Sequence, residues 1–199
     1  MSPTTSAAAA PDLLPPPTLA VPAHLLPYDV PIPQYLATQP GVDELLTAAV
    51  VFDPHTDKIL LVQRAASDGV PHRWETPGGS VEPAADATVL AAAARELREE
   101  SGLAADAVVA LVHAHEFDHG GRTFQKLTFE FEVTGLSSSS SSAAAPVVVT
   151  LDPAEHQDYV WASEEECRAR RADGRTLVFT FPSQEAALEA AFARRKARG

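Results

Sequence analysis

The sequence GGSVE at residues 78–82, followed by ARELREESGL at residues 94–103, joins a glycine turn to an acidic helix. On a helix with 3.6 residues per turn, Glu96, Glu99 and Glu100 project from one narrow arc. Like charges at these spacings repel one another, so the triplet favours a site that binds a cation. A hard divalent ion such as Mg²⁺ takes carboxylate oxygens as ligands and leaves positions for water and phosphate oxygens.

The two ends of this acidic helix are marked in the sequence. Asp86 stands where an N-cap residue would, and Gly102 stands where a left-handed residue closes a helix. Leu90, Ala94 and Leu97 form an apolar seam opposite the acids. The pattern predicts a helix of about fourteen to sixteen residues that docks on a sheet and turns its carboxylates to a cleft. The alternative is a solvated surface helix of an unrelated α/β domain.

These residues resemble the signature of the Nudix hydrolases. Gly79 and the run RELREESGL at residues 95–103 are similar to the loop–helix–loop of that family, and WETPGG at residues 74–79 resembles the segment that leads into it. The chain departs from the pattern in one place. Gly79 and Arg95 are two residues further apart than in the family, and Ala85 stands where the family has its first glutamate. Asp86 and Glu82 are the two candidates to brace the loop instead.

The resemblance implies an α/β fold, the Nudix α/β/α sandwich with a mixed β-sheet. It implies metal-dependent hydrolysis of a diphosphate linkage in a nucleoside diphosphate joined to another moiety, such as ADP-ribose. The alternative is a catalytically inactive Nudix-fold module that binds nucleotides or regulates. The altered spacing and the missing glutamate are the features that favour this alternative.

The site residues are assigned from the same resemblance. The metal ligands are Glu96, Glu99 and Glu100, the ion is Mg²⁺ with Mn²⁺ as an alternative, and Glu96 is either a ligand or the general base. The residues with expected catalytic roles are Glu96, Glu99, Arg95 and Glu155. The residues expected near the substrate are Gly78, Gly79 and Arg64, which follows a strand. His156 accompanies Glu155 as a second-tier candidate.

Composition limits the class of protein. The chain has 199 residues and a net charge of −12, which favours one domain and argues against a nucleic-acid surface. No apolar run is long enough for a membrane span, and the single cysteine, Cys167, excludes an intramolecular disulfide. We therefore expect a cytoplasmic protein, with the nucleus as an open alternative, that acts on a small nucleotide-type substrate. The oligomeric state is open, with a homodimer as one option.

Domain organisation follows from the low-complexity segments. Ten of the seventeen prolines lie in the first forty residues, which predicts a disordered leader over residues 1–27 and a domain over residues 28–198. The serine and alanine tract at 137–146 predicts a flexible insertion. Residues 28–40 either pack on the domain as an extended strap or do not.

The remaining elements are predicted from apolar patterning. Residues 45–52 and 59–63 are expected to form a hairpin. Residues 108–117 and 126–133 form two strands around a Gly120-Gly121 turn, and 147–151 forms another strand. A capping box at residues 163–166 opens one late helix, and residues 183–185 open the last one. Three histidines, His113, His115 and His119, lie close together, but their spacing matches no zinc signature.

Overall fold

The computed structural model describes residues 19–133 and 147–198, and its largest element is a mixed sheet of three strands. The strand order is β1-β5-β4, with β1 parallel to β5 and β4 antiparallel to it. A second, antiparallel sheet has the order β3-β2-β6, and β7 and β8 form a small hairpin. The strands are β1 (Glu44–Val51), β2 (Ile59–Arg64), β3 (Trp74–Glu75), β4 (Ala105–His119), β5 (Arg122–Val133), β6 (His156–Ala162), β7 (Arg171–Ala172) and β8 (Arg175–Thr176).

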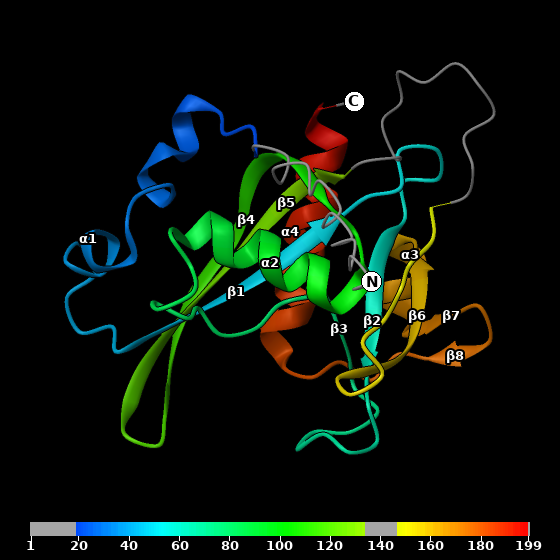
Figure 1. Ribbon diagram of the computed structural model, residues 1–199. Coiled ribbons are helices and arrows are strands. Elements are labelled where there is room, and N and C mark those ends of the chain that lie inside the picture. Colours follow the sequence, from blue (N-terminus) through cyan, green and yellow to red (C-terminus); the bar gives the residue numbers. More distant parts are fainter. Residues whose placement is uncertain (1–18, 134–146, 199) are drawn as a thin grey trace, which may run out of the picture.

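Helices cover both faces of the mixed sheet. Figure 1 shows α2 in front of this sheet and α4 behind it, and the main partner strands are β1 for α2 and β4 for α4. The helical elements are η1 (Ala23–Tyr28), α1 (Ile32–Leu36), α2 (Val89–Ser101), α3 (Glu164–Ala169) and α4 (Pro182–Arg198). The expected α/β/α sandwich with a mixed sheet is therefore confirmed. None of these helices is both long and apolar enough to cross a bilayer.

The hairpin of β4 and β5 forms as its sequence predicts. Gly120 and Gly121 both have positive φ angles, 60° and 76°, which suit a tight turn. The apolar residues of β5 alternate onto the face beneath α2, where Leu127, Phe129 and Phe131 are buried. Thr128 and Glu130 on the opposite face are buried as well. Both faces of this strand are therefore covered, as a three-layer sandwich requires.

The predicted hairpin of residues 45–52 and 59–63 is wrong, because β1 and β2 belong to different sheets. Their backbones meet at one bridge, between Phe52 and Ile59. The edge of β1 that β2 would need is taken by the segment Pro77–Val81. Thr47 N donates to Gly79 O at 2.8 Å, and Ala49 N donates to Pro77 O at 2.7 Å. The expected strand at 147–151 is also wrong. This segment forms no strand and instead lies against the end of α2, where Thr150 N donates to Ser101 O.

The late helices begin close to where the sequence marks them. The capping box of α3 is present in both directions between Ser163 and Glu166. The last helix, α4, begins at Pro182, one residue before the predicted start. Pro at the first turn of a helix removes only an N–H group that has no intrahelical partner.

Part of the predicted leader packs on the domain. Ala20 pairs with β4, since its N–H donates to Asp106 O and its carbonyl accepts from Val108 N. Leu25 of η1 is only 2% exposed. Residues 1–18 of the leader and the predicted insertion at 137–146 lie outside the described residues. The expected disorder therefore does not hold for residues 19–27, because their apolar side chains find a face of the core.

The strap at residues 28–40 also packs, as a short helix rather than as an extended chain. Ile32 and Tyr35 of α1 are buried, and the Tyr35 hydroxyl donates to Gln125 Oε1 at 2.8 Å. Tyr28 meets Phe129 edge to face, with ring centroids 5.3 Å apart. The N-terminal segment is therefore part of the core beneath β5.

We expect Leu25→Ala to lower the free energy of unfolding by about 2–4 kcal/mol, because it removes a buried side chain and leaves a cavity. The measurement is urea denaturation of the full chain. Leu26→Ala is the matched control, since Leu26 lies in the same helix and is half exposed. Equal midpoints for Leu25→Ala and wild type would show that residues 19–27 add nothing to the core.

Candidate functional site

The glycine turn lies against the middle of β1 and leaves no room for side chains. A Cβ atom on Gly78 would overlap the carbonyl oxygen of Thr47 and approach Ala48 Cα to 2.6 Å. A Cβ atom on Gly79 would lie 2.8 Å from both carboxylate oxygens of Glu96. The N–H of Gly78 donates to Glu100 Oε2 at 2.7 Å. The two glycines therefore let the loop touch both the sheet and the acidic helix.

The acidic helix is shorter than predicted and begins later. Its N-cap is Thr88, whose hydroxyl accepts from Ala91 N, so the prediction of Asp86 as the cap is wrong. The helix has 13 residues and ends at Gly102, which has the predicted left-handed conformation with φ 72°. Thr88 precedes the helix directly with extended dihedrals, whereas Asp86 is engaged elsewhere.

The acidic arc is split between the interior and solvent. Glu96 and Glu100 are buried, while Glu99 is exposed. Leu97 lies fully in the core as predicted, whereas Ala94 of the predicted seam is only partly buried. The three carboxylates therefore do not share one environment, although they share one arc of the helix. The helix sits deep enough in the fold to enclose two of them.

Arg95 organises the outer half of this site. Its Nη1 lies 3.0 Å from Glu96 Oε1 and 2.8 Å from Glu99 Oε2. Its Nε and Nη2 donate to the two carboxylate oxygens of Asp86 at 2.8 and 2.9 Å. Asp86 also accepts from the N–H of Glu82 at 2.8 Å, so it braces the long loop on one side and holds Arg95 on the other. The Glu82 side chain is exposed. Of the two candidates for bracing, Asp86 makes these contacts.

We expect Asp86→Asn to lower the free energy of unfolding by about 1–3 kcal/mol, because it leaves a charged donor less well paired. Although burial alone would raise its pKa, Arg95 and the Glu82 N–H hold the pKa of Asp86 below its usual value. The charged form is thus the one that the fold favours. We also expect the apparent Mg²⁺ affinity to fall about 10-fold or more, as for other residues that orient ligands.

The measurement for this variant is urea denaturation with chelator, followed by a Mg²⁺ titration. Glu82→Gln is the matched control, because it changes a carboxylate of the same loop without a buried contact. If the two variants behaved alike, Asp86 would not be the brace.

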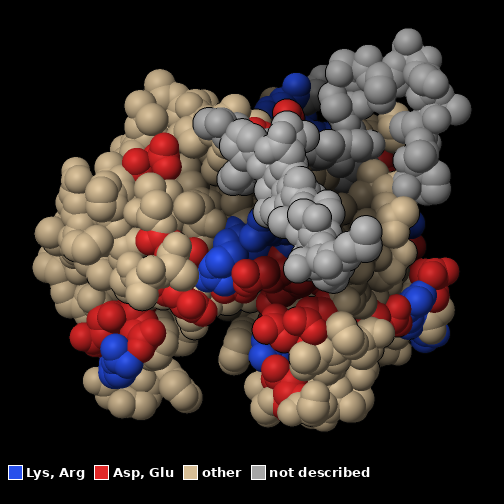
Figure 2. Space-filling model, viewed as in Figure 1, with Lys and Arg blue, Asp and Glu red and all other residues tan. Residues whose placement is uncertain are grey.

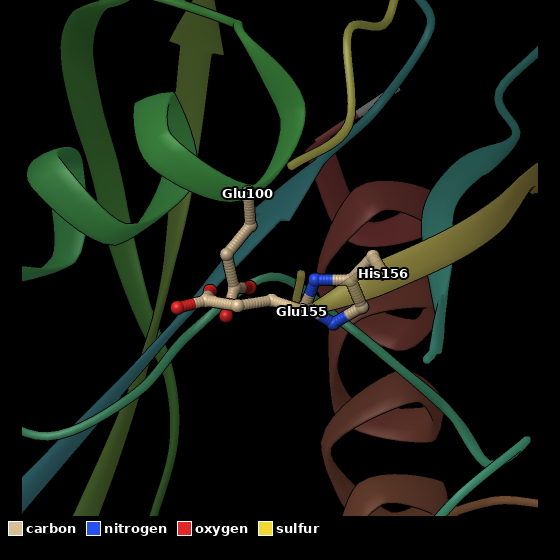
Figure 3. A group of neighbouring side chains, drawn as sticks. All are labelled: Glu100, Glu155 and His156. Atoms are coloured by element: carbon tan, nitrogen blue, oxygen red, sulfur yellow. The ribbon is translucent and has the colours of Figure 1, made fainter. Parts of the chain in front are cut away.

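A second group of ligands faces α2 from the start of β6. One ligand atom each from Glu100, Glu155 and His156 lie within 4.8 Å of one another. In Figure 3 the Glu100 side chain comes down from α2, and its carboxylate meets that of Glu155 beside the imidazole ring. His156 is buried, and neither of its ring nitrogens has a hydrogen-bond partner among the described residues. The structure thus brings Glu155 and His156 to the acidic helix.

Two further residues belong to this site and were not assigned from the sequence. Glu75 of β3 is buried and accepts from Arg64 Nη1 at 2.6 Å. Its Oε1 lies 3.6 Å from His156 Nε2. Lys126 of β5 is coupled by charge to both Glu75 and Glu100. Glu75 lies inside the WETPGG segment quoted above, so its place next to the glycine turn could have marked it as a site residue. The position of Lys126 in the site is set only by the packing of β5, which the sequence does not show.

Arg64 is held by carboxylates on both sides. Its Nε and Nη2 donate to Asp68 at 2.9 and 2.6 Å, and its Nη1 donates to Glu75. Arg64 therefore lies beside the site, and its guanidinium is bound by Asp68 and Glu75.

The electrostatics of the site favour a bound cation. Burial, together with the charges of Glu75, Glu96 and Glu155, raises the pKa of Glu100 to about 9, although the Gly78 N–H acts to lower it. Burial also raises the pKa of Glu96. Carboxylates this close cannot all stay ionised without a counter-charge. Figure 2 shows acidic side chains gathered across the centre of this face. An oxygen-rich set with one buried imidazole that makes no hydrogen bond fits a divalent ion.

The three histidines of β4 form no such group. His113 and His115 lie side by side, with ring centroids 5.1 Å apart. Among the described residues, the cluster that could hold a metal contains neither of them, nor His119. The structure thus gives no support to a zinc site there.

Comparison with known proteins gives one family. The sequence matches the NUDIX domain family over residues 45–180. A search of curated proteins gave no match. Among solved structures, the Escherichia coli ORF135 protein has 30% identity and a TM-score of 0.57, with 78% of this chain and 92% of that chain covered.

Two more distant structures share the fold. The NUDIX domain of Shewanella oneidensis NrtR, complexed with ADP ribose, has 17% identity and a TM-score of 0.57 over 82% of this chain and 98% of that one. A Caenorhabditis elegans Ap4A hydrolase has 18% identity and a TM-score of 0.53 over 77% of this chain and 98% of that one. At these identities the likeness concerns the fold alone.

Proposed function

Since this chain belongs to the NUDIX domain family of pyrophosphohydrolases, we propose that it hydrolyses a diphosphate linkage with a bound divalent metal ion. The substrate class is a nucleoside diphosphate joined to a second moiety, such as ADP-ribose or a related nucleotide. The observation that carries the proposal is the group of Glu100, Glu155 and His156 beside the Gly78 turn, with Glu96 of the same helix against Gly79.

The metal ligands are Glu96, Glu99 and Glu100, with Mg²⁺ as the ion and Mn²⁺ as the alternative. Glu155 and His156 lie next to Glu100 and complete the proposed set. A bound divalent ion polarises phosphoryl oxygens and lowers the pKa of its water. Arg95 is a positioning residue, because all of its contacts go to Asp86, Ser80 and the acids of α2.

Glu155 is the better general base of the two candidates. Its side chain is exposed and receives no hydrogen bond from the described residues, so its carboxylate is free to take a proton from water. Glu96 is less free, because it is buried and paired with Arg95. Gly79 contributes by leaving space for the Glu96 carboxylate, and Arg64 contributes by fixing Glu75.

The choice of substrate class draws on two neighbours. The NrtR domain was solved with ADP ribose, and the nematode protein is an Ap4A hydrolase. Both ligands contain a nucleoside attached to a chain of phosphates. The altered spacing and the missing glutamate are the features that favour the inactive module. Against it, Asp86 supplies a carboxylate to the long loop, where it holds Arg95 and the Glu82 N–H.

The test is turnover by the full chain over a panel of ADP-ribose, dinucleoside polyphosphates, nucleotide sugars, coenzyme A and oxidised deoxynucleoside triphosphates. Each reaction is run with Mg²⁺, with Mn²⁺ and with chelator. We expect metal-dependent release of a nucleoside monophosphate from at least one of them. Nucleotide binding without turnover in any metal would replace the proposal by the inactive module.

A further inference from the structure

An apolar cleft of about 500 Å³ lies on the face of the mixed sheet away from α2, beside the start of α4. Its floor comes from neighbouring positions on three strands, because Leu46 of β1 pairs with Lys126 of β5, which pairs with His115 of β4. Phe181, just before α4, lines the cleft as well. The volume lies within the range of small-molecule sites.

The cleft has an aromatic wall that is partly open to solvent. Phe117 of β4 and Phe124 of β5 stack with ring centroids 5.4 Å apart and planes at 13°. His115 continues this ladder, 5.7 Å from Phe117. Phe117 and Phe181 are 37% and 54% exposed, although both are large and apolar. Exposed aromatic side chains gathered around one cavity indicate a ligand that covers them.

One end of the cleft meets the acidic site. Lys126 lines the cleft and is coupled by charge to Glu75 and Glu100. Leu46 lines the cleft too, and its backbone bridges to Ser80, the residue after the Gly78-Gly79 turn. A ligand in the cleft can therefore extend past Lys126 to the carboxylates. The Lys126 ammonium suits an anionic part of that ligand, and the aromatic wall suits a flat and apolar part.

We infer that this cleft binds the planar ring of the substrate's nucleobase by stacking between Phe181 and the ladder of Phe117 and Phe124, with Lys126 on the adjoining phosphate. The inference rests on the proposed function for the reaction that takes place beyond Lys126. Aromatic stacking accepts every base, because each base has a π-face. Among the described residues that line the cleft, His115 Nδ1 is the one buried polar atom without a hydrogen-bond partner. The edge of the base is therefore read at His115.

The test uses AMP as a probe, because AMP has a base and a phosphate but no diphosphate linkage to hydrolyse. Its binding to the full chain in Mg²⁺ is measured by calorimetry, and inorganic phosphate is the ring-free comparison. We expect Phe181→Ala and Phe117→Ala each to weaken AMP binding by about 5- to 150-fold, the range for loss of one stacking partner. Phosphate binding should not change. Phe117→Trp and Phe181→Trp should bind AMP about as well as the wild type does, because tryptophan keeps an aromatic face.

Tyr159→Ala is the matched control, since Tyr159 is an aromatic residue of β6 with the same 37% exposure as Phe117 and does not line the cleft. It should bind AMP as wild type does. Unchanged AMP binding in both alanine variants would overturn the inference. A dimeric wild type that becomes monomeric in Phe181→Ala, with AMP affinity unchanged, would also overturn it and assign the cleft to a second copy of the chain.

Turnover separates this inference from the proposed function. On any substrate that the wild type hydrolyses, Phe117→Ala should raise KM and leave kcat nearly unchanged, because the ring lies away from the reacting atoms. If no substrate is hydrolysed, AMP binding still decides whether the cleft takes a base. If hydrolysis occurs but KM is equal in Phe117→Ala and wild type, the base binds elsewhere. The inference then fails, while the proposed function stands.

Discussion

Glu100→Gln should lower turnover by about a thousandfold while the fold stays intact, because a metal ion supplies several kcal/mol of transition-state stabilisation. Glutamine keeps the size of the side chain and an oxygen that accepts from Gly78 N. Burial raises the pKa of Glu100 to about 9, so without metal its neutral form predominates at pH 7 and glutamine resembles that form. The variant therefore removes a metal ligand and little else. Glu99→Gln should lower turnover in the same direction.

The measurement is kcat together with thermal melting, in chelator and over a range of Mg²⁺ concentrations. Mg²⁺ at a hundred times its Kd should stabilise the wild type by about 2.7 kcal/mol, and it should stabilise Glu100→Gln much less. In chelator the two proteins should melt together. Glu189→Gln, at an exposed position of α4, is the control for loss of one negative charge. A variant that melts well below wild type in chelator would show that Glu100 is a structural group.

The parts of the fold that were predictable from sequence are those set by local physics. The β4–β5 hairpin follows from period-two alternation around Gly120-Gly121, and the end of α2 follows from Gly102. The start of α2 was harder, because Asp86 and Thr88 are both N-cap types. Only the structure shows that the carboxylate oxygens of Asp86 accept hydrogen bonds from Arg95 and from the loop N–H of Glu82.

The pairing of β1 could not be predicted, because it depends on segments that are distant in sequence. One edge of β1 meets β5, about eighty residues on, and the other meets the Pro77–Val81 segment. Proximity along the chain favoured β2 as the partner, yet β2 lies in the other sheet. Pairing between distant segments depends on how the whole sheet buries its faces. A local apolar pattern does not show which segment a strand will pair with.

The candidate site divides in the same way. Helical spacing shows that Glu96, Glu99 and Glu100 share an arc, but it does not show how deep the helix sits, so the burial of Glu96 and Glu100 was missed. Glu75 and Lys126 reach the site from two different sheets. Their side chains have ordinary strand positions in the sequence. Only the packing of the two sheets turns them toward Glu100.

Gly78→Ala should be the most destabilising single change in the site loop. Its Cβ atom would overlap Thr47 O and lie 2.6 Å from Ala48 Cα, and both are backbone atoms of β1 that cannot rotate away. Relief requires the Pro77–Val81 segment to leave β1, which breaks the bonds of Thr47 N and Ala49 N. We expect a loss of about 3 kcal/mol or more in the free energy of unfolding. For a domain of this size that corresponds to a fall in Tm of about 6–12 °C.

Gly79→Ala should show the opposite balance between stability and activity. Its Cβ atom would meet the carboxylate of Glu96, the end of a flexible side chain, rather than backbone. Moving that carboxylate should cost only about 1 kcal/mol of stability but about a hundredfold in turnover, because misplacing a catalytic group by about 1 Å has that effect. Urea denaturation and kcat are measured for both variants, with Gly69→Ala as the control, because no atom lies within 4 Å of a Cβ atom there. If Gly79→Ala kept full turnover, Glu96 would have no place in the catalytic set, whatever its burial beside Arg95.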